Sequence, residues 1–286
     1  MLMKTNKISI LSFTILFCFI STGSAVSQSR KIKRSLVAFW DFKEPPGSPR
    51  KSKSFKSDVS YNLIEANGAV ETLNEGPAMN SAVRIEQGNW LFIPRDSIGE
   101  LNIYGDDAEV TVLAWIRKDS DKIWQAIAGV WDETHNKRQY YLFSNAHSRT
   151  YQDEMVRYPA KDMIHGHISA TGGVSPGERA WISYASSNDS VEVGVWTMIA
   201  MTYNGKEIKL YINGRLSSNE RTNPFKYEDG IFDGGMDGAD FTVGANHVQG
   251  KMTNQFIGAI SGLSVFNRAL SEKDIRWIYT NGIDID

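Results

Sequence analysis

The length, composition and charge of the chain exclude several classes of protein. Its 286 residues are 41% hydrophobic, which is enough apolar material for a core and excludes disorder over most of the chain. The net charge of −2 argues against a nucleic-acid-binding protein, so we expect no nucleic acid as a partner. The single cysteine, Cys18, excludes a disulfide scaffold.

The N-terminus has the three parts of a secretory signal. Lys4 and Lys7 precede an uncharged, mostly apolar stretch over residues 8–20, and Gly23-Ser24-Ala25 supplies small residues for cleavage. The apolar stretch is shorter than the roughly 20 residues of a membrane span. We therefore predict a signal peptide over residues 1–25 and a secreted or periplasmic protein with no integral membrane segment after cleavage.

Basic residues are concentrated between Arg30 and Lys56, where only Asp41 and Glu44 are acidic. This run is either a patch for a sulfated or uronic-acid polymer or a solvated leader and loop. Charge runs are usually solvated, so we favour the second interpretation. We assign residues 26–34 to a basic leader, and the polar, proline-containing stretch over residues 45–60 to a loop.

Alternation of apolar and polar residues with period two dominates the rest of the chain and predicts many short strands. The candidates are Leu36–Phe42, Ala82–Gln87, Trp90–Pro94, Val110–Arg117, Gln125–Trp131, Gln139–Asn145, Met163–Ala170, Ala180–Ser186, Trp196–Tyr203, Glu207–Asn213, Phe241–Ala245 and Phe256–Phe266. Asn204-Gly205 and Asn213-Gly214 predict hairpin turns, since both residue types tolerate positive φ. The regular spacing of the strands is typical of a sandwich or barrel.

One helix is predicted, near the C-terminus. Ser271 can cap its first turn, with Asp274 three residues later in the position of a capping box. Ile275, Ile278 and Tyr279 give the helix one apolar face, and Gly282 is a plausible stop.

Four stretches of the chain carry a family resemblance. They are Val37–Phe42, Asp58–Asn62, Trp196–Gly214 and Phe256–Ser271. Together they resemble the laminin-G-like branch of the concanavalin A-like lectin/glucanase superfamily, in a domain over residues 35–286. The resemblance implies an all-β fold, a two-sheet antiparallel β-sandwich (jelly roll, concanavalin A-like) with a short C-terminal helix, in which one concave sheet offers a groove. Members are mostly carbohydrate- or protein-binding modules, and a minority are glycoside hydrolases or polysaccharide lyases.

The predicted strand over residues 163–170 carries the most distinctive polar residues. His165, His167 and Ser169 share one face, opposite Ile164, Gly166 and Ile168. Two histidines on one face can bind a metal, act as acid and base, or donate hydrogen bonds to a sugar. The alternative is the solvent-facing side of an ordinary strand.

Residues near the predicted strand over 139–145 support a groove. Arg138 is suited to grip a carboxylate or sulfate, and Gln139, Tyr140 and Trp181 are further candidate ligand contacts. Glu133 joins His165 and His167 as a candidate catalytic residue. The aromatic residues have an alternative place in the core of the sandwich.

Two acidic segments are candidate metal sites, for which Ca²⁺ is the expected ion. The glycine-rich stretch over residues 229–240 offers Asp233, Asp237 and Asp240, although its spacing is not that of an EF-hand. The alternative for this stretch is a solvated turn. Asp58 and Asn62 are a second candidate, suggested by the resemblance.

These observations favour a secreted, lectin-like protein that binds an extracellular polysaccharide or another glycan. No paired-carboxylate motif or nucleophile elbow is present, which leaves enzymatic activity uncertain. The alternatives are a polysaccharide lyase or glycoside hydrolase that uses the same groove, and an adhesion module that binds protein.

Overall fold

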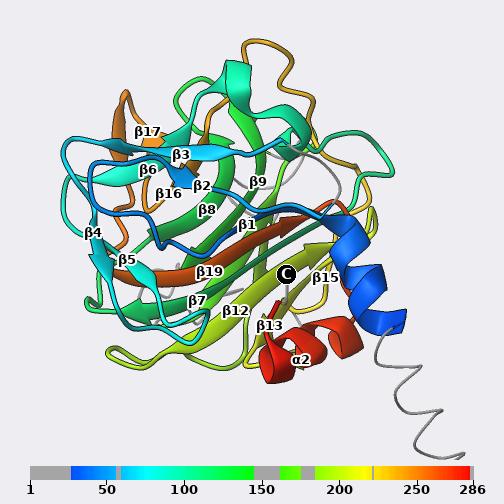
Figure 1. Ribbon diagram of the computed structural model, residues 1–286. Coiled ribbons are helices and arrows are strands. Elements are labelled where there is room, and N and C mark those ends of the chain that lie inside the picture. The colour runs from blue at the N-terminus through cyan, green and yellow to red at the C-terminus, as the bar shows by residue number, and fades with distance from the viewer. Residues whose placement is uncertain (1–26, 56–58, 145–161, 175–183, 221, 284–286) are drawn as a thin grey trace, which may run out of the picture.

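The computed structural model describes residues 27–55, 59–144, 162–174, 184–220 and 222–283. Within them the chain forms two mainly antiparallel sheets that pack face to face (Figure 1). The predicted two-sheet β-sandwich is therefore confirmed. The predicted signal peptide and Cys18 lie outside the described residues. No helix among the described residues is long and apolar enough to cross a membrane.

The first sheet contains nine strands of the described chain. Its main path runs β14-β13-β12-β7-β19-β5-β4, with β1 paired to β19 and β15 paired to β13. The strands are β1 (Leu36–Trp40), β4 (Glu71–Leu73), β5 (Ala82–Ile85), β7 (Val110–Lys118), β12 (Thr197–Tyr203), β13 (Glu207–Ile212), β14 (Arg215–Leu216), β15 (Phe225–Lys226) and β19 (Gly258–Phe266). The pairing of β7 with β19 joins the middle of the chain to its C-terminal part.

The second sheet contains ten strands of the described chain. Its main path runs β11-β10-β9-β8-β16-β6-β3-β2, and the β17–β18 hairpin joins it through β8. The strands are β2 (Arg50–Lys51), β3 (Asn62–Ala66), β6 (Trp90–Ile93), β8 (Gln125–Asp132), β9 (Lys137–Ser144), β10 (Ile164–Ile168), β11 (Tyr184–Ser186), β16 (Phe241–Val243), β17 (Asn246–Val248) and β18 (Lys251–Thr253). Candidate functional residues gather on this sheet.

The C-terminal helix α2 (Glu272–Asn281) begins and ends as predicted. The Ser271 hydroxyl accepts a hydrogen bond from the Asp274 amide, and the Asp274 carboxylate accepts from the Ser271 amide, which forms the expected capping box. Gly282 follows the helix with a φ of 76°. Two short 3₁₀ helices, η1 (Arg95–Ser97) and η2 (Gly99–Leu101), connect β6 to β7.

A second helix covers residues 27–35, where the sequence predicted only a basic leader. Its buried Ile32 packs with Ile275 and Ile278 of α2, and Gln28 donates a hydrogen bond to Asp274. Figure 1 shows both helices on the same side of the sandwich. The leader was predicted as solvated, but it has an apolar face that finds a partner far along the chain.

Three apolar layers hold the fold together. The main core lies between the sheets, where Val112 and Ile199 of the first sheet share one cluster with Leu142 of the second. A second cluster lies between the first sheet and the two helices. A third cluster covers the outer face of the second sheet and consists of Ala126, Trp131, Tyr141 and Phe143. The second sheet therefore carries an apolar cluster on each of its faces.

The turns and loops confirm part of the sequence analysis. Asn204-Gly205 connects β12 to β13, and Asn213-Gly214 connects β13 to β14 with φ of 48° and 80°, as predicted. The predicted loop over residues 45–60 is wrong in one part, because β2 pairs with β3 there. Arg50 is fully buried, forms an ion pair with Glu65 at 2.5 Å, and donates to backbone carbonyls, so it belongs to no surface patch.

Candidate functional site

The strand that carries His165 and His167 is β10 of the second sheet, and both side chains lie on the outer face of that sheet. Ile164 and Ile168 face the main core, and Gly166 approaches the Met201 side chain of the first sheet, so His165 and His167 share the opposite face as predicted. That face is not an open polar surface, however. His165 is 0% exposed and His167 is 7% exposed. The expectation of an accessible histidine pair is therefore wrong.

Aromatic rings surround these two histidines. The His167 ring centroid lies 4.7 Å from Phe143, 5.4 Å from Trp131 and 6.1 Å from Trp124, and Trp124 also lies 5.6 Å from His165. Burial lowers the pKa of His165 to about 3, and burial together with the nearby His165 and Arg138 lowers the pKa of His167 well below its usual value. Both imidazoles are consequently neutral near pH 7.

Three other predicted contacts have structural roles. Tyr140 is buried in the main core, where its hydroxyl donates to the Leu101 carbonyl at 2.6 Å. Gln139 is also buried, and its amide donates to the Phe232 carbonyl at 2.9 Å. Ser169 is 1% exposed, and its hydroxyl donates a hydrogen bond to the Gly173 carbonyl. Because burial and these bonds occupy the polar atoms, none of the three side chains is placed to touch a glycan.

Ionisable side chains gather where β8 turns into β9. We call Asp132, Glu133, His135, Arg138 and His247 the ionic rim. Glu133 accepts a hydrogen bond from the Trp131 indole at 3.1 Å and lies 3.7 Å from the Arg138 guanidinium, which is 5.9 Å above the Trp131 ring. Burial raises the pKa of Glu133, against the lowering effects of Arg138 and Trp131. The rim therefore holds a partly buried carboxylate beside a cation and an aromatic ring.

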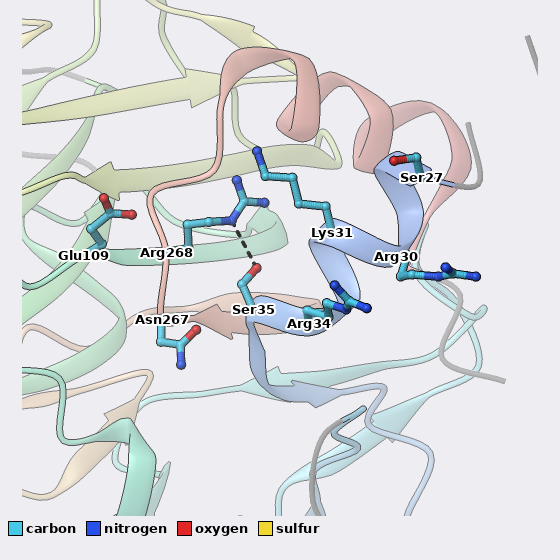
Figure 2. Close-up of a pocket in the computed structure, with 8 residues that line it drawn as sticks. All are labelled: Ser27, Arg30, Lys31, Arg34, Ser35, Glu109, Asn267 and Arg268. Carbon is cyan, nitrogen blue, oxygen red and sulfur yellow. Dashed lines mark hydrogen bonds between the residues drawn. The ribbon is translucent and has the colours of Figure 1, made fainter. Parts of the chain in front are cut away.

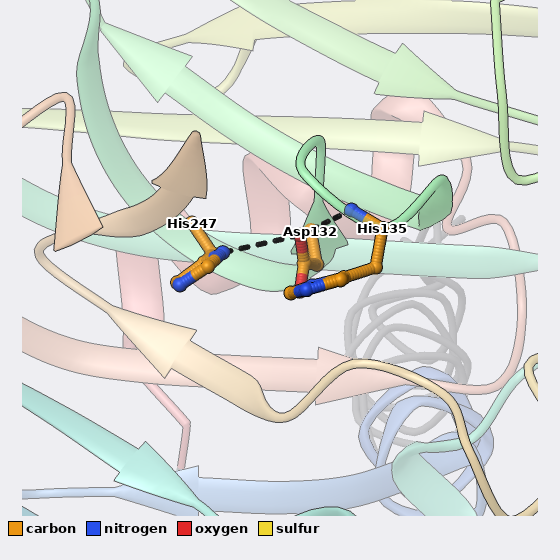
Figure 3. Close-up of side chains that lie close together, drawn as sticks. All are labelled: Asp132, His135 and His247. Carbon is orange, nitrogen blue, oxygen red and sulfur yellow. Dashed lines mark hydrogen bonds and ion pairs between the residues drawn. The ribbon is translucent and has the colours of Figure 1, made fainter. Parts of the chain in front are cut away.

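Three members of the ionic rim lie within reach of one another. The Asp132 carboxylate lies 2.7 Å from His135 Nδ1 and 3.3 Å from His247 Nδ1. The two imidazole rings stack at 5.3 Å with an interplanar angle of 20°. Figure 3 shows the three side chains turned toward one another, with His247 coming from a different strand. The sequence analysis missed His247, since its pairing with β8 is a long-range contact.

A strip of side chains on the same outer face was also missed. Leu91 and Ile93 of β6 lie in the core, so Trp90 and Phe92 project outward, and both are half-buried. Phe92 pairs across the sheet with Ile64, which is 40% exposed, and with Thr242. We call Ile64, Trp90, Phe92 and Thr242 the outer strip. Thr242 lies within hydrogen-bond distance of the Tyr141 hydroxyl, so the strip is continuous with the aromatic cluster around His167.

The acidic loop after residue 229, for which calcium stays a prediction, is organised around Arg95. Asp240 accepts from the Arg95 amide, and the Arg95 guanidinium donates to the Gly235 carbonyl at 2.8 Å. Asp233 accepts from the Gly235 amide and Asp237 is exposed. The structure does not gather these carboxylates into a metal-binding group, since Asp132, His135 and His247 form the one such group in the described chain. A guanidinium already supplies the positive charge in this loop.

The remaining predicted site residues cannot be placed together. Asp58 and Trp181 lie outside the described residues. Asn62 is exposed at the start of β3, where its side-chain oxygen accepts a hydrogen bond from the Ser60 hydroxyl at 3.3 Å. The Asp58–Asn62 metal site therefore stays a prediction.

A cationic groove of about 720 Å³ lies between the helix over residues 27–35 and the segment that leads into α2. Figure 2 shows Arg30, Lys31 and Arg34 of the helix and Arg268 on its walls, with Glu109 as the acidic member. Arg268 pairs with Asp274 at 3.1 Å. The residues of the N-terminal basic run therefore have different roles. Three of them line this groove, whereas Arg50 is buried and pairs with Glu65.

An antiparallel two-sheet sandwich with a short C-terminal helix defines the chain as a jelly-roll protein. The family model of the concanavalin A-like lectin/glucanases superfamily matches residues 97–276, and the chain belongs to this superfamily. No curated protein matches the sequence significantly.

Solved structures show the same fold at low sequence identity. Domain 4 of an extracellular arabinanase from Geobacillus stearothermophilus, in complex with arabinotriose, is 14% identical with a TM-score of 0.54, over 85% of this chain and 97% of that one. A Trypanosoma rangeli sialidase is 12% identical with a TM-score of 0.55, over 88% of this chain and 33% of that one. The binding domain of botulinum neurotoxin serotype C1 is 14% identical with a TM-score of 0.50, over 88% and 53%. At these identities the likeness establishes the fold alone.

Proposed function

We propose that this chain is an exported, lectin-like protein that binds an extracellular glycan on the outer face of its second sheet. The outer strip is the observation that carries the proposal. Trp90 and Phe92 are half-buried and stand on one face of β6, so both side chains are partly open to solvent. The apolar face of a sugar ring packs well against aromatic surfaces. Export rests on the signal predicted over residues 1–25.

The ionic rim complements the strip in chemistry. Binding sites for small molecules combine apolar walls with a few placed polar groups. Glu133 and Asp132 offer carboxylate oxygens to sugar hydroxyls. Arg138 is only 5% exposed, and it lies beside Glu133 and donates to the Asn136 side chain at 3.0 Å, so it supports the rim from beneath. The similar arabinanase domain was solved with arabinotriose, which supports a saccharide as the class of ligand.

A glycan array followed by titration tests this function. We expect Trp90→Ala and Phe92→Ala each to weaken binding at least about tenfold, the equivalent of about 1.4 kcal/mol. Tyr279→Ala is the matched control, because Tyr279 is an aromatic residue of α2 that is 41% exposed and stacks on Trp115 of the first sheet. Unchanged binding in the two strip variants would refute the location. Absence of any bound glycan at millimolar concentration would refute the function and favour a protein-binding module.

One observation favours a second candidate, a glycoside hydrolase or polysaccharide lyase that uses the same face. The raised pKa of Glu133 keeps its carboxyl protonated to higher pH than usual, as a general acid requires. A turnover screen with Glu133→Gln decides between the candidates. Products that disappear in this variant would establish an enzyme, and binding without products would leave the lectin.

A further inference from the structure

Three side chains of the ionic rim have the chemistry of metal ligands. Asp132, His135 and His247 place two imidazole nitrogens and a carboxylate oxygen within 4.8 Å of one another. We propose that they form a binding site for a divalent transition-metal ion, for which Zn²⁺ is the probe ion. The site differs in place and in donor chemistry from the calcium candidates of the sequence analysis. It also goes beyond the proposed function, because it needs no glycan.

The separations between the donor atoms suit such an ion. Zinc bonds of about 2.0–2.1 Å set neighbouring ligand atoms roughly 2.8–3.4 Å apart in octahedral or tetrahedral geometry. Asp132 Oδ2 lies 2.7 Å from His135 Nδ1, Asp132 Oδ1 lies 3.3 Å from His247 Nδ1, and one donor atom from each residue lies within 4.8 Å of the other two, so the three side chains must draw closer together to share one ion. Two imidazoles with one carboxylate suit zinc, nickel or copper, whereas Ca²⁺ requires oxygen ligands.

The backbone holds the three ligands in place before any ion arrives. His247 stands opposite Asp132 in the β17–β8 pairing, and the Glu133 amide donates to the His247 carbonyl at 2.8 Å. The His135 amide donates to Asp132 Oδ1 at 3.0 Å, which fixes the turn that carries His135. Thr134 Oγ1 accepts a hydrogen bond from the Gly250 amide of the β17–β18 turn at 2.9 Å, and it also lies 2.9 Å from His247 Nδ1, a contact that an ion bound at this nitrogen replaces. Preorganised ligands lose little entropy on binding a metal.

The position of the cluster also allows a metal ion to enter from solvent and to leave again. The His135 side chain is 62% exposed and that of His247 is 29% exposed, so the ion has a path from solvent. Three protein ligands leave at least one coordination position for water or another small ligand, as in open zinc sites.

Calorimetric titration of the chelator-treated protein with ZnCl₂ at pH 7.5 tests the site. We expect saturable binding of one ion per chain. His135→Phe and His247→Phe keep a planar ring for stacking but remove the nitrogen donors, so each should weaken binding at least about tenfold. Asp237→Asn is the control, since it removes an exposed carboxylate outside the cluster and should leave the affinity unchanged. Co²⁺ bound at the same site should give visible absorption bands that both histidine variants lose.

Several outcomes would overturn the site. Absence of saturable binding up to ~1 mM zinc in the wild type would do so, and so would equal affinity in either histidine variant. If the wild type binds no zinc but the histidine variants have lower thermal stability, the cluster is a simple ion pair. His135→Asn is the second variant if a phenylalanine variant fails to fold, because His135 is exposed. The readout requires no glycan, so failure of the proposed function leaves this test intact.

Discussion

Acidification should destabilise the fold through His165. Its pKa is about 3 in the folded protein because of burial, against about 6.5 for an exposed imidazole. The folded state therefore disfavours the proton that the unfolded state accepts. The contribution of the neutral imidazole to stability is complete above pH 6.5 and is lost as the pH falls from 6.5 toward 3. At pH 5 proton linkage gives a loss of about 2 kcal/mol from this residue.

Urea denaturation at pH 7.5 and at pH 5 measures this loss. His165→Gln replaces the imidazole by an amide that does not titrate in this range. The substitution itself changes the free energy of unfolding at pH 7.5. The informative quantity is therefore the change in this free energy between the two pH values, compared between the wild type and the variant. Between the two pH values, the wild type should lose about 2 kcal/mol more of its free energy of unfolding than the variant does. Burial also lowers the pKa of His167, so His165→Gln/His167→Gln should have a flatter profile still.

Equal losses in the wild type and in His165→Gln would refute this reasoning. Such a result would mean that the folded protein protonates His165 as easily as the unfolded chain does. The imidazole would then be in contact with water, and the outer face of β10 would again be a candidate for acid–base chemistry. The measurement therefore bears on function as well as on stability.

Three further predictions concern the fold and the cationic groove. Gly129 has a φ of 152°, and an added Cβ would lie 2.3 Å from a carbonyl oxygen of β9. Gly129→Ala should therefore lower the free energy of unfolding, measured by urea denaturation, by at least about 2 kcal/mol. Gly173→Ala is the control, because the atom nearest to an added Cβ is 3.7 Å away, and it should cost less than about 0.5 kcal/mol. Ser271→Ala removes the helix cap and should lower stability by about 1 kcal/mol, as a reduced Tm in thermal denaturation. Arg34→Glu should elute from heparin–agarose at a lower salt concentration than the wild type. Arg215→Glu, a charge reversal outside the groove, should lower the eluting salt concentration less. Equal decreases in the two variants would show that only net charge matters.

The sequence predicted those parts of the fold that depend on local patterns. Period-two alternation located the long strands of both sheets, and Ser271 with Asp274 located the C-terminal helix. Shorter strands such as β3 and β17 escaped prediction because a few residues carry little periodicity. The helix over residues 27–35 escaped because its basic residues conceal an apolar contact through Ile32.

The candidate site depended on long-range contacts that no local pattern contains. Alternation correctly placed His165 and His167 on one face, but it does not reveal what packs on that face. In β9 both faces are apolar, so the sequence could not separate the core position of Tyr140 from the outer position of Tyr141. The acidic loop appeared suited to a cation, and Arg95 of η1 places a positive charge there.

Burial also decides which chemistry the outer face can perform. His165 and His167 are neutral near pH 7 and lie among aromatic rings, which suits packing better than proton transfer. Asp132, His135 and His247 of the ionic rim are titratable groups with access to solvent, where the β8–β9 turn meets β17. If the protein is an enzyme, the rim therefore offers better candidates for its acid and base than the two buried histidines do. If it is a lectin, the same rim provides polar contacts and the outer strip provides the surface on which a sugar ring packs.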